Sequence, residues 1–398
     1  MSAGAREGEP LEMSLYVHVP FCASKCAYCD FASAAVDAGD PSVEWTFDAY
    51  VAAVERDVAR HAAAGLLASV PTVYVGGGTP TLLGSRLAGL VASLAAMVGL
   101  APDAEVTVEA NPDSLTVPLA HGLANAGVTR VSLGVQSFDD EVLSVLGRRH
   151  DAQSARRAAA AVVEAGLALS VDLMCGVPGL SDEGWRESLR EAIATGAEHV
   201  SVYPLTIEDG TPLCERVETG AFPEPDSDGA AEQMLTAARV LADAGFERYE
   251  VANHARPGAR SRHNTRYWTG GAYLGVGPAA ASMLPAGAYV DACVPGDAAR
   301  VRFTASASLS DFLADVPAAR TAEFETLTAE EALREDAMLG LRLAEGISAD
   351  LARCAGVEDV LRELADDGLV ECAGDRWRTT ERGWLLGNAV YGRVWAGE

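Results

Sequence analysis

The sequence has few positive charges and no long apolar run. Its 398 residues carry 30 Lys and Arg against 57 Asp and Glu, a formal net charge of −27 at pH 7. Such an excess of negative charge repels phosphate backbones and anionic lipid surfaces, which argues against nucleic acid as a partner. Pro, Glu and Asp interrupt every apolar stretch before it reaches the roughly 18 residues of a membrane helix. The sequence therefore predicts a soluble protein.

The N-terminus lacks the pattern of a signal peptide, and most cysteines lack a nearby partner. Residues 1–12 hold Arg6, Glu7 and Glu12 and no apolar core, which predicts a cytoplasmic protein and leaves open a transient contact with a membrane. Three of the eight cysteines fall within eight residues, and the other five are scattered. Because cytoplasmic cysteines stay reduced, this clustering indicates metal binding rather than disulfide bonds.

Six short runs rich in β-branched residues alternate with stretches that have helical spacing. Nearly continuous apolar strands between helices predict a parallel sheet covered by helices, here an α/β fold with a partial (β/α)6 barrel similar to a TIM barrel. The predicted strands are 14–19, 72–75, 105–109, 130–135, 169–174 and 199–203, and the clearest predicted helices are 43–58, 152–165 and 182–195.

Polar or glycine-rich residues follow every predicted strand. In barrels of this kind the C-terminal ends of the strands hold the chemistry, so these residues are candidates for a functional site. They are Phe21-Cys22, residues 76–80 (GGGTP), 109–112 (EANP), Gln136-Ser137, residues 175–178 (CGVP) and residues 204–206 (PLT).

Cys22, Cys26 and Cys29 form a Cys-x3-Cys-x2-Cys motif. Thiolates suit iron–sulfur clusters, and four of them usually hold a cubane. Three leave one iron open, where the amino and carboxylate groups of S-adenosylmethionine can bind and receive an electron that releases a 5′-deoxyadenosyl radical. A structural zinc site is the alternative, but zinc prefers four ligands and Cys-x2-Cys pairs, which this spacing lacks.

The run 16–31 (YVHVPFCASKCAYCDF) resembles a radical-SAM group that contains the oxygen-independent coproporphyrinogen oxidases and the HemW heme chaperones. The resemblance extends over nearly the whole chain through residues 76–80, 109–112, 134–137, 172–178 and 263–268. It implies a [4Fe–4S] cluster on the three cysteines and an S-adenosylmethionine site. It places the Tyr16 backbone, Gly77, Gly78 and Thr79 beside the cofactor, and implies that the Glu109 carboxylate binds its polar groups.

The same resemblance assigns four more cofactor-binding residues. Tyr28 belongs to this set, and Gln136, Arg148 and Asp172 match positions that help the oxidase to hold a second S-adenosylmethionine. Whether this chain binds one or two is left open. The alternatives are that Asp172 is a polar residue of the core and that Arg148 is a surface charge beside Arg149. His18, near the cluster loop, is expected to support that loop by hydrogen bonding.

Two features separate the close relatives. The oxidase resemblance requires a fourth cysteine where this chain has Phe31, and an N-terminal extension longer than the fifteen residues before Tyr16. Both departures match the chaperones. The run 263–268 (HNTRYW) resembles the HNxxYW signature of the chaperones, and histidine is a common axial ligand of heme iron, so His263 is the candidate heme ligand, with Tyr267 and Trp268 as aromatic walls. His254 is a weaker candidate.

We therefore interpret the chain as a heme chaperone that carries the cluster, S-adenosylmethionine and heme. The resemblance implies that the chain transfers heme to an acceptor, such as a respiratory-chain hemoprotein at the membrane. The alternatives are a coproporphyrinogen oxidase and another tetrapyrrole-acting radical-SAM enzyme, such as a methyltransferase. No catalytic residue is assigned, and enzymatic activity and homodimer formation are left open.

The predicted domains are a tail (1–13), the barrel with the heme-binding segment (14–285), a loop-like connection (286–322) and a C-terminal domain (323–398). The last resembles a winged helix, with helices at 328–343, 347–354 and 357–367 and a hairpin from 369, and is expected to dock on the barrel. The remaining cysteines are predicted to be small core residues; they are Cys175, Cys214, Cys293, Cys354 and Cys372.

Overall fold

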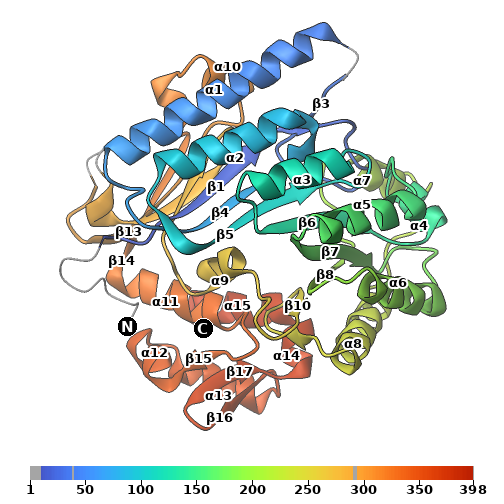
Figure 1. The fold of residues 1–398 in the computed structure, drawn as a ribbon. Helices are drawn as coiled ribbons and strands as arrows, with labels where there is room; N and C mark the ends of the chain where they lie inside the picture. Colours follow the sequence, from blue (N-terminus) through green and yellow to red (C-terminus); the bar gives the residue numbers. More distant parts are fainter. Residues whose placement is uncertain (1–9, 38–39, 290–293, 398) are drawn as a thin grey trace.

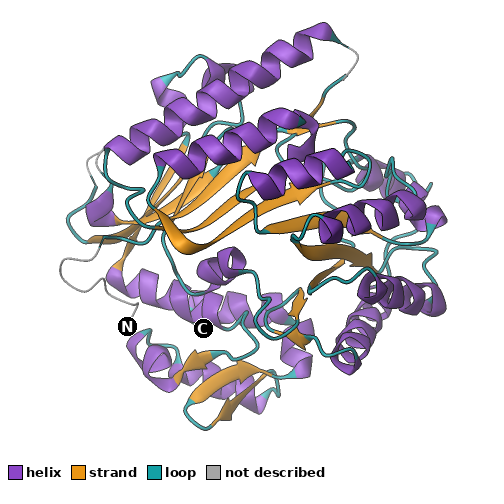
Figure 2. Ribbon diagram, viewed as in Figure 1, coloured by secondary structure: helices purple, strands orange, loops and turns teal. Residues whose placement is uncertain are grey.

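The computed structural model describes residues 10–37, 40–289 and 294–397 and shows an α/β protein with helices packed along the face of a large sheet (Figure 1, Figure 2). Within these residues the main sheet has twelve strands, of which six adjacent parallel ones form the partial barrel. All six predicted strands are confirmed. In spatial order they are β1 (Ser14–Val19), β4 (Val70–Gly77), β5 (Leu100–Ala110), β6 (Arg130–Gln136), β7 (Ala168–Cys175) and β8 (His199–Pro204).

The helices between these strands bury the predicted apolar stripes. In α1 (Pro41–Ala63) the buried side chains include Val43, Phe47, Tyr50 and Val54, and the carboxylate of Asp40 accepts the Ser42 N–H at the start of the helix. Such a cap satisfies one of the backbone donors that a helix start leaves unpaired. The other barrel helices are α2 (Ser85–Met97), α3 (Val117–Asn125), α4 (Asp140–Val145), α5 (Ala152–Glu164), α6 (Asp182–Ala194), α7 (Pro212–Glu218) and α8 (Ser227–Asp243), with the 3-10 turn η1 (Pro80–Leu83).

The sheet continues beyond both ends of the barrel. On one side β11 (Tyr273–Val276) pairs in parallel with β1 and is followed by antiparallel β12 (Ala281–Pro285), β13 (Ala298–Thr304) and β14 (Glu323–Thr328). On the other side β10 (Asn253–Ala255) pairs antiparallel with β8, and β9 (Glu247–Arg248) pairs antiparallel with β10.

The prediction that residues 286–322 form a loop-like connection was wrong in one respect. This stretch contains β13, α10 (Leu309–Leu313) and the turns η2 (Ala286–Ala288) and η3 (Pro317–Arg320). Arg300 and Arg302 alternate with Val301 and Phe303 along β13, and the charges hid the strand pattern. They are tolerated because carboxylates of a helix more than thirty residues later neutralise them.

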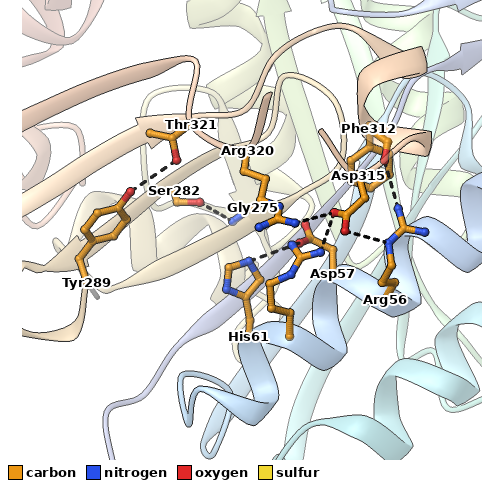
Figure 3. Close-up of polar contacts among 11 residues, drawn as sticks. Arg56, Asp57, His61, Gly275, Ser282, Tyr289, Phe312, Asp315, Arg320 and Thr321 are labelled. Atoms are coloured by element: carbon orange, nitrogen blue, oxygen red, sulfur yellow. Dashed lines mark hydrogen bonds and ion pairs between the residues drawn. The ribbon is translucent and has the colours of Figure 1, made fainter. Parts of the chain in front are cut away.

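An arginine cluster fastens the segment from α10 to η3 onto α1 (Figure 3). Asp315, between α10 and η3, has a φ of 56°, a conformation that costs a side chain other than Gly or Asn some strain. Its carboxylate lies 2.7 Å from Arg60 Nη2, 3.0 Å from Arg320 Nη2 and 3.7 Å from Arg56 Nε. These ion pairs offset the strain and hold the segment over a cavity of about 70 Å³.

The C-terminal domain follows β14 and has a core of its own, which includes Leu341, Ile347, Leu361 and Val390. The three predicted helices and the hairpin are confirmed, whereas the last two helices were not predicted. The elements are α11 (Ala329–Gly340), β15 (Ile347–Ser348), α12 (Ala349–Cys354), α13 (Glu358–Asp366), β16 (Val370–Ala373), β17 (Arg376–Thr379), α14 (Glu381–Leu385) and α15 (Gly387–Ala396).

The core prediction for the scattered cysteines holds for two of them. Cys175 and Cys214 are buried, but Cys354, at the end of α12, and Cys372, on the hairpin strand β16, are exposed. Both exposed cysteines lie at solvent-facing positions of short elements, a property that composition does not reveal. Cys293 and most of the predicted tail (residues 1–9) lie outside the described residues. No helix in the described part of the chain is long and apolar enough to cross a membrane.

Candidate functional site

The three clustered cysteines lie on the loop that follows β1. The short strands β2 (Phe21–Cys22) and β3 (Ala34–Ala35) pair in parallel and close this loop. His18 supports it as predicted, because its Nε2 donates to the Ala32 carbonyl at 2.9 Å. Nδ1 is then the acceptor for the Tyr16 hydroxyl, also at 2.9 Å. Burial lowers the pKa of His18, so the ring is neutral.

A cavity of about 320 Å³, here called the strand-end cavity, opens at the C-terminal ends of the barrel strands. Cys22, Cys26 and Cys29 line it together with eight of the nine predicted S-adenosylmethionine residues. Tyr16, the ninth, does not line it. The structure thus brings together residues that are up to 150 positions apart. The eight are Tyr28, Gly77, Gly78, Thr79, Glu109, Gln136, Arg148 and Asp172.

The glycine run after β4 is shaped for close approach of a ligand. Gly77 has a φ of +109°, and a Cβ there would meet the His18 ring at 2.7 Å. A Cβ on Gly78 would lie 2.5 Å from the Phe21 carbonyl and 3.0 Å from Cys22 Sγ. No larger residue fits at either position, so the main chain itself forms this wall beside the cysteines.

No three His, Cys, Asp or Glu side chains of the described ranges are close enough to share one metal ion. A four-iron cluster spaces its thiolates more widely than a single ion does, so this observation concerns single-ion sites. Three thiols on one loop, lining one cavity beside a glycine wall, fit the donor set of a cluster with one open iron.

Glu109 is the carboxyl group at the centre of the cavity wall. The Tyr74 hydroxyl donates to its Oε1 at 2.7 Å, and the Gly77 N–H donates to its Oε2 at 2.9 Å. Burial raises the pKa of Glu109 to about 7 despite these two donors. Asp172 is a second carboxyl group of the wall and is half-buried, and the Ser132 hydroxyl lies 3.2 Å from its Oδ1. Burial raises the pKa of Asp172 as well.

Arg148 ties the cluster loop to the barrel. Its Nη1 lies 3.3 Å from Cys26 Sγ, and its Nη2 donates to Asn111 Oδ1 and to the Gly134 carbonyl, both at 2.7 Å. This geometry excludes the alternative that Arg148 is a surface charge. Gln136 ends β6 with a φ of 67°, next to a register shift against β7, and this irregularity coincides with its place on the cavity wall.

Several cavity residues were not predicted as site residues. Asn111 and Thr206 stood in strand-end runs, and that position was the signal that could have identified them. Ser132 and Met174 lie within strands and gave no such signal. At the mouth, Phe31 is 58% exposed and Tyr203 is 42% exposed, which leaves two aromatic side chains open to solvent beside the cavity.

The structure places His263 away from the cysteines. It lies on α9 (Arg262–Trp268), which packs against β4 and α11 below the sheet (Figure 1). Its ring contacts Thr72, near the start of β4, whereas the strand-end cavity is at the end of that strand. His263 is 1% exposed and does not line the cavity.

Both ring nitrogens of His263 have partners. Thr72 donates its hydroxyl proton to Ser14, so its oxygen accepts from His263 Nδ1 at 2.8 Å. Nε2 then accepts from the Tyr267 hydroxyl at 2.9 Å. Burial, and secondarily the positive charge of Arg266, lowers the pKa of His263 to about 3, so the ring is neutral. His254, the weaker candidate, is buried on β10.

Comparison with known proteins gives the family. The model of the radical SAM superfamily matches residues 16–192, and the HemN C-terminal domain model matches residues 327–386. The chain is 39% identical over 390 residues to heme chaperone HemW of Mycobacterium tuberculosis, covering 96% of this chain and 94% of the relative. The chain belongs to the HemW family. HemW of Escherichia coli is 35% identical, over 95% of this chain and 97% of its own length.

HemW of Bacillus subtilis is 31% identical over 95% of this chain and 98% of the relative. Among solved structures, coproporphyrinogen III oxidase (HemN) of Escherichia coli superposes with a TM-score of 0.79 at 22% identity, covering 97% of this chain and 91% of that one. This likeness establishes the shared α/β fold. Membership of the radical SAM superfamily implies S-adenosylmethionine and an iron–sulfur cluster as cofactors.

Proposed function

We propose that the protein is a heme chaperone, which holds a [4Fe–4S] cluster on Cys22, Cys26 and Cys29 with S-adenosylmethionine and delivers heme to an acceptor protein. The observation that carries this proposal is the similarity to bacterial HemW proteins over almost the whole length of both chains. Phe31, in place of the fourth cysteine expected of the oxidase, supports the same conclusion. The proposed acceptor is a respiratory-chain hemoprotein, reached from the cytoplasm.

The residues of the strand-end cavity have different roles in binding the cofactors. Gly77 and Gly78 let the main chain approach S-adenosylmethionine, and Glu109 accepts hydrogen bonds from its polar groups. Arg148 sets a positive charge against the Cys26 sulfur. When bound, the cluster and S-adenosylmethionine supply a one-electron cleavage that yields a carbon radical. The chain's own residues position and enclose that chemistry.

One experiment separates the chaperone from its alternatives. The cluster is reconstituted anaerobically, and the same sample is tested for heme binding, for heme transfer to an apo-hemoprotein, and for conversion of coproporphyrinogen. We expect stoichiometric heme binding and transfer without conversion. Multiple turnovers of coproporphyrinogen to protoporphyrinogen would identify an oxidase instead, and absence of heme binding would refute the proposal.

His263 is the proposed axial ligand of the heme iron, through Nε2. Tyr267 occupies that lone pair, so heme must displace a hydrogen bond of about 1 kcal/mol. We therefore expect Tyr267→Phe to bind heme about five times more tightly than wild type, and His263→Ala to lose the heme absorption band shift. Heme titrations followed by absorption spectroscopy measure both. Equal heme affinity in all three proteins would exclude His263 as the ligand.

The only lysine of the sequence, Lys25, gives an independent test of where heme binds. Lys25 lies between Cys22 and Cys26 and lines the strand-end cavity, which His263 does not line. An amine-selective acetylating reagent therefore modifies this side chain alone, apart from the terminal amine. If heme binds through His263, we expect an unchanged acetylation rate at Lys25 in mass spectra. Strong protection by heme would instead place heme at the mouth, beside Phe31 and Tyr203.

Binding of S-adenosylmethionine should depend on pH through Glu109. With a pKa of about 7 in the free protein, Glu109 must lose a proton on binding below pH 7 if the cofactor's donors hold it ionised. Relative to Glu109→Gln at the same pH, the dissociation constant of wild type should rise about tenfold per pH unit below 7 and stay level above it, as isothermal titration calorimetry can measure. Glu109→Gln is the control, because it retains only the titration of the cofactor's own amine. Equal pH profiles for both proteins would contradict the prediction.

A further inference from the structure

A column of side chains runs through the barrel from α9 to the strand-end cavity. The His263 ring stacks on the Tyr74 ring, with centroids 5.0 Å apart and 28° between the planes. The Tyr74 hydroxyl donates to Glu109 Oε1 at 2.7 Å, and Glu109 Oε2 accepts the Gly77 N–H at 2.9 Å. Three side chains therefore link the helix below the sheet to the carboxyl group of the cofactor wall.

The base of this column is held rigidly. The Glu105 carboxylate accepts the first two backbone N–H groups of α9, at 2.8 and 3.0 Å, which fixes the start of the helix. The ring of His263 is held by Thr72 on one side and Tyr267 on the other. Tyr267 packs edge-on against His263 and against Tyr273, at 5.1 and 4.6 Å between centroids. The imidazole cannot rotate without breaking two hydrogen bonds. The orientation of the ring face that stacks on Tyr74 is therefore fixed.

We propose that His263 and Tyr267 are positioning residues for Glu109. By fixing the Tyr74 ring from below, they aim its hydroxyl at the Glu109 carboxyl and so set the affinity of the strand-end cavity for S-adenosylmethionine. The inference rests on the proposal that this cavity binds that cofactor. Because the same two residues form the proposed heme segment, heme on His263 Nε2 loosens Tyr74, and heme and S-adenosylmethionine weaken each other's binding by the same factor.

None of the other groups that face Glu109 gains or loses a charge when His263 is replaced by a neutral residue. They are contributed by four strands and α9. The imidazole is already neutral, so its loss removes no charge from the barrel. A change in the titration of Glu109 in such a variant therefore reports the Tyr74 hydrogen bond. These groups are Asp172, Arg130, Tyr16, Tyr203 and Tyr267.

His199 provides a matched control. It is also a buried histidine between a strand hydroxyl and a tyrosine, with Ser170 Oγ 2.8 Å from Nδ1 and the Tyr249 hydroxyl 2.9 Å from Nε2. Its aromatic neighbour is Tyr249, which does not contact Glu109. Replacing either histidine by asparagine removes a comparable buried ring, but only one of them supports Tyr74.

The test compares His263→Asn, His199→Asn and wild type, each with a reconstituted cluster, by calorimetric titration with S-adenosylmethionine between about pH 6 and 8.5. We expect His263→Asn to bind about tenfold more weakly, with the midpoint of its pH profile raised by about 0.5–1 unit, because the Tyr74 hydrogen bond favours ionised Glu109. His199→Asn should stay within about twofold of wild type at an unchanged midpoint.

Unchanged affinity and midpoint in His263→Asn would overturn the inference. If circular dichroism shows that His263→Asn does not fold, Tyr267→Phe, which keeps the aromatic ring, replaces it in the test. We expect Tyr267→Phe to bind S-adenosylmethionine about two- to fivefold more weakly than wild type. An unchanged affinity in this variant would likewise overturn the inference. Heme titrations on the same samples separate the two proposals. If His263→Asn loses heme binding but binds S-adenosylmethionine as wild type does, only the positioning role is refuted. If wild type itself binds no heme, only the chaperone proposal is refuted.

Discussion

Replacing Cys26 by alanine should abolish the iron–sulfur absorption of the reconstituted protein. Two thiolates cannot hold a four-iron cluster, and every other cysteine of the described residues lies outside the loop that carries Cys22 and Cys29. The change also leaves the Arg148 guanidinium without the sulfur that it contacts at 3.3 Å. Binding of S-adenosylmethionine should fall with the cluster, because its amino and carboxylate groups lose the open iron.

Iron and sulfide analysis with absorption spectra measures this result, and Cys372→Ala is the matched control. Cys372 is an exposed cysteine on the C-terminal hairpin, so its removal should leave the cluster complete. The thermal midpoints of the two unreconstituted variants should agree, which shows that Cys26→Ala has lost a ligand and not its fold. A full complement of iron in Cys26→Ala would refute the three-thiolate assignment.

The second large effect is expected at Arg300, which joins the sheet to the C-terminal domain. Its guanidinium lies 2.8 Å from Glu335 Oε2 and 2.8 Å from Asp336 Oδ1, and all three side chains are at most 10% exposed. Arg300→Met would leave two buried carboxylates facing each other with one cation fewer. We expect the free energy of unfolding to fall by about 3–5 kcal/mol.

Urea unfolding measures this loss, with Arg353→Met as the control. Arg353 pairs with Asp350 on the surface, at 62% and 85% side-chain exposure, so its loss should cost less than about 1 kcal/mol. The deficit of Arg300→Met should shrink as the pH is lowered, because burial already raises the pKa of Asp336 and protonation removes the repulsion. This account would be contradicted if Arg300→Met lost no more free energy of unfolding than Arg353→Met, or if its loss grew as the pH was lowered.

The barrel strands and the cluster motif could be predicted because they depend on local pattern. The run Ser14–Val19 is mostly apolar, is followed by Pro20 and is too short for a helix, and its predicted limits are those of β1. The cluster motif could be predicted from the spacing of the three cysteines alone. The cavity followed from one rule, that parallel strands place their C-terminal ends at one edge of the sheet.

The strand β13 could not be predicted in the same way. The residues that alternate with its apolar side chains are arginines, and what makes them acceptable in a sheet is a pair of carboxylates on α11. Likewise the conformation of Asp315 depends on arginines 255 and 259 positions earlier along the chain as well as on Arg320. Partners of this kind become visible only after the chain has folded.

The sequence by itself determined the barrel and the family, and it predicted the three cysteines and most of the other residues that the structure brings to the strand-end cavity. Only the tertiary structure decided the place of His263, since Thr72 and Glu105, which hold it, are 191 and 158 positions away. A motif of histidine and aromatics predicts a ligand by its chemistry alone. Whether its nitrogens are free, and which ring lies above it, depends on long-range packing that no local pattern encodes.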